Sequence, residues 1–159
     1  MNFVKKKLKW ILAAFVILFA LLQLANPAHT NPPVKTDFLA TLNPPPKIAG
    51  MFRAACYDCH SNETRWPWYS HIMPMSWQIV QDVNDGRDNL NLSEWPTDNP
   101  KRAWKKMENM SEEIDGGDMP LKKYTLIHAD ARLTAEQRSD LTGWLDDEVD
   151  KMKAQAGQK

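Results

Sequence analysis

The chain has 159 residues, with 20 basic side chains, 20 acidic side chains and only two cysteines. Two cysteines are too few for a disulfide scaffold. Four of the basic residues precede position 10, so the remainder carries 16 basic and 20 acidic residues, a net charge of −4. This balance argues against nucleic acid as a partner, because such binding needs a basic patch. It is typical of an ordinary solvated surface and leaves a basic protein partner open.

The N-terminus predicts a membrane segment. A cluster of four lysines, Lys5, Lys6, Lys7 and Lys9, precedes an apolar run over residues 10–25. The run lies between the usual length of a signal peptide and that of a spanning helix. No clean cleavage site follows it, so we expect residues 1–25 to form an uncleaved anchor, with a cleaved signal as the alternative. The lysines predict a cytoplasmic N-terminus and an exported domain.

The next segment, residues 26–46, holds six of the 11 prolines. Such a stretch cannot form a continuous helix. It predicts an extended, semi-rigid linker between the membrane and one domain over residues 47–155.

Four helices are expected in that domain, and no convincing alternating strand appears, which predicts an all-α fold. Their approximate ranges are 46–60, 74–86, 99–114 and 134–152. Asn99 followed by Pro100 predicts the start of the third helix, and Thr134 with Gln137 predicts a capping box for the fourth. Gly86 predicts the end of the second helix. The apolar stripes expected to face inward are Ile48, Phe52, Ala55, Cys56 and Cys59; Ile72, Met75, Ile79, Val80 and Val83; Trp104, Met107, Met110 and Ile114; and Leu141, Trp144, Leu145, Val149 and Met152.

The most informative segment is Cys56-Tyr57-Asp58-Cys59-His60. The pattern C-x-x-C-H is the attachment signal for c-type haem. Two cysteines three residues apart share a helix face and could each form a thioether with one haem, while His60 coordinates the iron. Export agrees with this chemistry, because thioether formation removes both thiols from an oxidising compartment.

Two other interpretations of this segment remain. A redox dithiol would need a βαβ context, which the surrounding sequence does not provide. A zinc site would have to combine His60 with the distant His71 or His128.

A second iron ligand is expected, and Met119 is the preferred candidate. It lies between Gly116-Gly117-Asp118 and Pro120, so it is in a loop and could reach the iron without breaking a helix. His71 and Met73, in a short connector, are the alternatives, and an open iron is a third possibility. Met51 is too close to Cys56, and Met75, Met107 and Met110 are expected to pack in the core.

The order of the C-x-x-C-H motif, a Met-Pro loop and a terminal helix with an aromatic residue resembles class I cytochrome c. More specifically, the chain resembles a bacterial family of small anchored proteins, the haem-binding domain family. The resemblance covers about residues 47–146 and depends on residues 56–64, 67–70, 76–77, 93–95, 119–121, 124–128 and 133–134, and Trp144. It implies one covalent haem at Cys56 and Cys59, iron ligation by His60, and Met119 on the opposite side.

With both axial positions filled, the iron can only change its oxidation state, so the leading hypothesis is a single-electron carrier outside the cytoplasm that serves other redox proteins. The alternatives are a haem-based gas or redox sensor and a peroxidase-like enzyme. Both need an open distal site, and the enzyme needs an acid-base residue such as His71 or His128. An ordinary structural role for these two histidines is the simpler interpretation.

Overall fold

The computed structural model describes the backbone of residues 2–157 and the side chains of residues 5–157. Within that range the chain forms helices and one isolated parallel bridge between Thr36 and Glu94, so the predicted all-α class is confirmed. The elements are α1 (Asn2–Leu22), η1 (Gln23–Ala25), α2 (Phe38–Leu42), α3 (Pro46–Ala55), α4 (Tyr57–His60), η2 (Trp68–His71), α5 (Met75–Asn89), α6 (Pro100–Gly116), α7 (Lys122–Ile127), η3 (Ala129–Ala131) and α8 (Ala135–Gly157).

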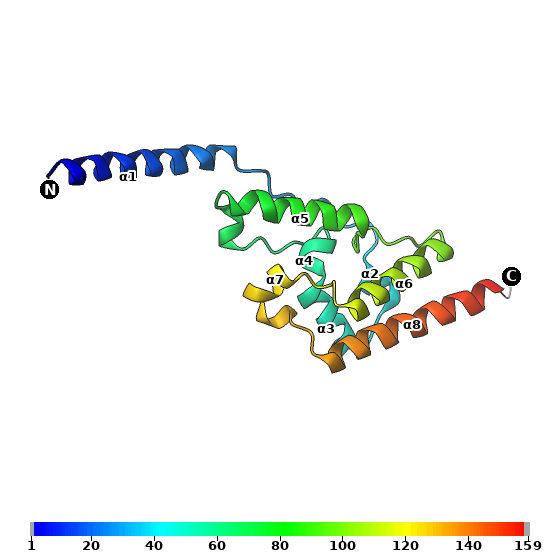
Figure 1. The fold of residues 1–159 in the computed structure, drawn as a ribbon. Helices are drawn as coiled ribbons and strands as arrows, with labels where there is room; N and C mark the ends of the chain where they lie inside the picture. Colours follow the sequence, from blue (N-terminus) through cyan, green and yellow to red (C-terminus); the bar gives the residue numbers. More distant parts are fainter. Residues whose placement is uncertain (1, 158–159) are drawn as a thin grey trace.

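Helix α1 projects away from the domain, and α8 ends on the opposite side (Figure 1). The stretch Lys5–Ala25 is long and apolar enough to cross a membrane, and none of it is buried against the domain. An apolar surface of this length without a protein partner fits a bilayer. By length and composition, α1 is therefore a candidate membrane anchor.

The capping signals predicted for the last two helices are confirmed. The Asn99 side chain accepts a hydrogen bond from the Arg102 amide and caps α6. Thr134 and Gln137 form the expected reciprocal capping box before α8. Gly117, with φ of 80°, ends α6 in the left-handed conformation that glycine adopts without strain.

The core lies between α3, α6 and α8 and is closed by α2. Phe38 is fully buried among three aromatic rings, with centroid distances of 5.1 Å to Phe52, 4.7 Å to Trp95 and 6.0 Å to Trp144. The first and last helices of the domain meet through Phe52 and Trp144. Their edge-to-face geometry is the arrangement that aromatic rings prefer.

The segment expected to be a linker lies against the domain. Asn31 donates to the Thr64 carbonyl, Thr36 N donates to Ser93 O, and Phe38 N donates to Leu92 O. The prolines correctly exclude a helix over residues 26–35, but they carry no information about what Phe38 contacts. The chain between α1 and α3 is hydrogen-bonded to the domain at several points, although residues 30–35 are exposed.

Two predicted helices differ from those observed. The first is divided at Cys56, whose φ of −123° separates α3 from α4. The second continues past Gly86 to Asn89, so Gly86 does not end it. The inward orientation expected for Ile72 and Met75 is wrong, since they are 37% and 49% exposed.

Replacing Phe38 with alanine should lower the free energy of unfolding by about 3–5 kcal/mol, because it empties an aromatic site in the core. A denaturant titration followed by far-UV circular dichroism measures this difference. Val34→Ala, in the same segment but at an exposed position, should stay within about 0.5 kcal/mol of the natural protein. Equal effects of the two changes would show that the segment does not contribute to the core.

Candidate functional site

A cavity of about 610 Å³ brings together the four residues that the sequence singled out. Cys56, Cys59, His60 and Met119 all line it. Its walls come from α4, α5 and α6, the loop after α6 and the start of α7. This volume lies within the range of ligand and cofactor sites. Segments separated by more than 60 positions in the sequence thus meet around one space.

His60 is oriented by two carbonyl groups of α5 and its C-terminal end. Its Nδ1 lies 2.9 Å from Gly86 O and 3.1 Å from Leu90 O. Carbonyl oxygens only accept hydrogen bonds, so Nδ1 carries the proton and Nε2 keeps its lone pair. Burial lowers the pKa of His60 and favours the neutral ring. This is the state and the backbone support typical of a metal-ligating histidine.

Gly86 permits the close contact between α5 and α4. A Cβ atom at this position would lie 2.7 Å from the Cys59 carbonyl oxygen. Only a residue without a side chain therefore allows α5 to approach the motif and place its carbonyl at His60. The signal in the sequence is an isolated glycine inside an otherwise amphipathic helix, and its prediction as a helix end is wrong.

The two residues between the cysteines hold α4 in place. Tyr57 donates a 2.7 Å hydrogen bond to Asp37, the residue that caps α2. Asp58 accepts hydrogen bonds from the Arg65 guanidinium through both carboxylate oxygens and from the Tyr124 hydroxyl at 2.8 Å. The motif is thus tied to α2 on one side and to α7 on the other.

The thiols are partly buried and are not joined to each other. Burial raises the pKa of Cys56 to about 12 and that of Cys59 to about 11. Both thiols are therefore protonated at neutral pH, which is unlike the acidic cysteine of a redox dithiol. This property disfavours the dithiol interpretation.

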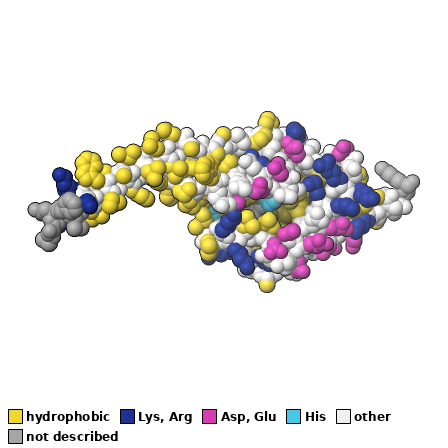
Figure 2. Space-filling model, turned by 45° about the horizontal axis from the view of Figure 1, so that its top comes forward, with side chains coloured by type: hydrophobic (Ala, Val, Ile, Leu, Met, Phe, Trp, Pro, Cys, Tyr) yellow, Lys and Arg dark blue, Asp and Glu magenta, His cyan; other side chains and the backbone are white. Residues whose placement is uncertain are grey.

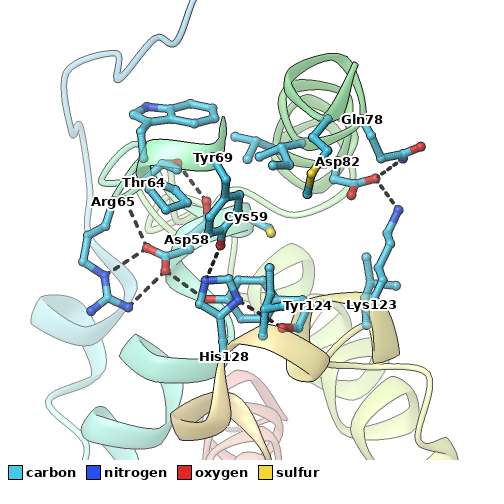
Figure 3. A pocket seen from close by; sticks show the side chains of 17 residues that line it. Asp58, Cys59, Thr64, Arg65, Tyr69, Gln78, Asp82, Lys123, Tyr124 and His128 are labelled. Carbon is cyan, nitrogen blue, oxygen red and sulfur yellow. Dashed lines mark hydrogen bonds and ion pairs between the residues drawn. The ribbon is translucent and has the colours of Figure 1, made fainter. Parts of the chain in front are cut away.

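A smaller pocket of about 240 Å³ adjoins the cavity and shares Cys59 with it. Figure 3 shows Asp58 between Arg65 and Tyr124, and Asp82 bridging Gln78 and Lys123. The remaining space is bordered mainly by apolar and aromatic side chains. These ion pairs and hydrogen bonds stabilise the part of the wall that α7 contributes.

Neither alternative histidine lines the larger cavity. His128 donates from Nδ1 to the Tyr124 carbonyl, so its Nε2 accepts a 2.8 Å hydrogen bond from the Tyr69 hydroxyl. His71 lies against His29, with ring centroids 4.1 Å apart. Met73 is fully buried, and its amide is bonded to Gln23. None of these residues shares the cavity with His60.

The loop that carries Met119 is held by backbone groups and by one arginine. The amides of Asp118 and Met119 both donate to Glu113 O. Arg138, on α8, donates to Ile114 O at 2.7 Å and to Met119 O at 2.8 Å. No local pattern in the sequence pointed to Arg138, because its partners lie about 20 residues before it.

Met110 also lines the cavity, and at 7% exposure it is nearly buried on α6. Its core position was expected, but its place in the cavity wall was not. Lys106 and Lys123 are the two lysines of the wall, and burial lowers the pKa of Lys106. Lys123 is already paired with Asp82, so Lys106 is the lysine of the wall that could pair with a carboxylate of a bound cofactor.

The family model of a haem-binding domain matches residues 17–147. The chain belongs to this family. Haem is therefore its cofactor, and the cavity fits it in its volume and in its nitrogen and sulfur donors. The match begins inside α1, so it includes the packed segment that follows the anchor. No curated protein and no solved structure matched the chain.

The zinc alternative is not supported. Among the residues that the structure describes, no three His, Cys, Asp or Glu side chains are grouped so that they could hold a metal ion. A structural zinc site needs four such ligands. The donors of the cavity instead suit an iron that brings its own porphyrin nitrogens.

Replacing Gly86 with alanine should remove about 1–3 kcal/mol from the free energy of unfolding, because the new methyl group overlaps the Cys59 carbonyl. It should also lower the haem content of the purified protein, since the Gly86 carbonyl that orients His60 must move. Absorbance per mole of protein measures haem content.

The matched control is Gly143→Ala, in the interior of α8, where a Cβ atom meets nothing within 4 Å. This change should leave haem content unchanged and stabilise the protein by about 0.5–1 kcal/mol. If Gly86→Ala behaved in the same way, close packing of α5 on the motif would be wrong.

Proposed function

We propose that this haem protein carries one covalently attached c-type haem and transfers single electrons outside the cytoplasm. The observation that supports this proposal most is the shared cavity of Cys56, Cys59, His60 and Met119. Bound haem supplies a reversible one-electron change of oxidation state at its iron. The chain supplies attachment, axial ligands, burial and a surface for redox partners.

The proposed roles follow from the positions of the side chains. Cys56 and Cys59 would form the thioethers, and His60 would hold the iron through Nε2, because its Nδ1 donates to the carbonyls of Gly86 and Leu90. Met119 is the proposed second ligand, with its loop held by Arg138. A thioether opposite an imidazole raises the reduction potential, which suits an electron acceptor.

A carrier is favoured over a peroxidase by the composition of the cavity wall. A peroxidase needs a distal acid-base residue, yet His71 does not line the cavity, and His128 lines the adjoining smaller pocket instead. Tyr69 and the Tyr124 carbonyl also occupy both nitrogens of His128. A gas or redox sensor remains the second candidate, since a displaceable Met119 would serve it, and carbon monoxide binding separates it from a carrier.

The proposed location follows from α1. Its lysines precede the apolar stretch, and by the positive-inside rule this arrangement supports a cytoplasmic N-terminus and a haem domain on the outer side of the bacterial inner membrane. Covalent haem attachment outside the cytoplasm is consistent with this orientation.

Covalent attachment predicts that haem stays with the denatured polypeptide during extraction with acidic organic solvent. Replacing either Cys56 or Cys59 with serine should weaken attachment by removing one thioether, and replacing both should abolish it. Absorbance of the two phases and the intact mass of the protein measure the outcome. Haem that enters the solvent from the unmodified protein would contradict the prediction.

Ligation by Met119 predicts that Met119→Leu and Met119→Ala both shift the iron from low spin toward high spin and increase carbon monoxide binding. The potential should fall, because a thioether favours the reduced iron. Met119→His should restore low spin at a lower potential. Absorption spectra and redox titration measure these effects.

Met110→Leu is the control, because it removes a sulfur from the same cavity at nearly constant volume. It should leave the spectrum unchanged. A change to high spin in Met110→Leu but not in Met119→Leu would transfer the ligand role to Met110. Ready carbon monoxide binding by the unmodified protein would favour the sensor over the carrier.

A further inference from the structure

Six large apolar side chains are exposed together at one end of the domain. They come from η2, the connector and start of α5, and α7, and they are Trp68, Ile72, Met75, Trp77, Leu126 and Ile127, between 37% and 76% exposed. We refer to these six residues as the apolar end. A cluster of this kind marks a surface that contacts something apolar.

The apolar end is assembled from two distant parts of the sequence. Met75 and Ile127 border the same small pocket. The hydrogen bond between the Tyr69 hydroxyl and His128 joins η2 to the end of α7. The residues before α5 and those of α7 are thus held side by side by the fold.

The apolar end is fixed next to the point where the chain leaves the anchor. Gln23 accepts a 2.9 Å hydrogen bond from the Met73 amide. Asn26 donates to the His71 carbonyl and accepts from the Ser76 hydroxyl. In Figure 2 the apolar surface of α1 continues onto the adjoining end of the domain. The anchor and the apolar end therefore have a fixed relative position.

The length of the anchor places this junction at the edge of the bilayer. The apolar residues 10–25 of the candidate span Lys5–Ala25 cover about 24 Å at 1.5 Å per residue, and the lysine stems before them extend the reach to the headgroups. The hydrocarbon core of a bilayer is about 30 Å thick. With the lysines on the cytoplasmic side, Asn26 reaches the headgroup layer of the outer surface, and so do its partners His71 and Ser76.

We infer that the apolar end lies on the outer surface of the bilayer, in the headgroup layer, and holds the haem domain against the membrane. None of its six residues is charged, and two are tryptophans, which favour this layer because one part of the ring is apolar and the other polar. The partner is a phospholipid surface. The inference depends on the proposed role of α1 as an anchor.

The test uses the full-length holoprotein in vesicles of phosphatidylethanolamine and phosphatidylglycerol that contain a phospholipid with a photoactivatable diazirine near its headgroup. After illumination, peptide mass spectrometry maps the lipid adducts and checks that residues 5–25 are intact. Adducts are expected in α1, in residues 66–79 and in residues 121–132. They are not expected in residues 145–157, which end on the opposite side of the domain (Figure 1).

The variant Trp68→Ser/Trp77→Ser/Leu126→Ser should keep its haem spectrum and its adducts in α1 but lose those of the domain. Val34→Ser, which alters an exposed apolar residue outside the apolar end, should keep both.

Adducts in α1 alone would overturn the inference and leave the anchor intact. Adducts in neither region would overturn the anchor and the inference together. Adducts spread to residues 145–157, or chain-to-chain cross-links at the apolar end in place of lipid, would also overturn the inference.

Discussion

The double hydrogen bond from His60 Nδ1 to the carbonyls of Gly86 and Leu90 is the constraint on which the site depends. It requires α5 to lie against the motif, and that approach is possible only because position 86 has no side chain. The carbonyl of His60 in turn accepts from the Leu92 amide, which sets the direction of the chain after α5. One ring therefore determines how α4, α5 and the following loop are placed.

Another wall of the cavity is built by a separate set of contacts. Met107, Met110 and Ile114 of α6 share one core cluster with Leu141, Leu145 and Val149 of α8. The same helix pair carries Arg138 to the carbonyls at the end of α6 and in the Met119 loop. The site thus has one wall set by backbone hydrogen bonding near the motif and another set by hydrophobic packing between long helices.

What could be predicted from the sequence is mostly local. The C-x-x-C-H motif, the capping of α6 by Asn99, the Thr134–Gln137 box and the loop position of Met119 each depend on a few neighbouring residues, and the structure contains them all. The orientation of Ile72 and Met75 failed, because periodicity shows that a helix face is apolar but not what covers it. Phe38, Gly86 and Arg138 act through partners distant in the sequence, which no local pattern reveals.

The packed segment between α1 and α3 has a consequence for how electrons could reach and leave this protein. A flexible tether of about 20 residues would let a domain move within a radius of about 25 Å around its anchor. Such a domain could reach partners by its own motion. Here hydrogen bonds from Asn31, Thr36 and Phe38 hold that segment against the domain. The distance between the domain and its anchor is therefore limited. For the proposed electron carrier, a redox partner would therefore have to diffuse to the fixed domain, and a partner in the same membrane would do so in two dimensions.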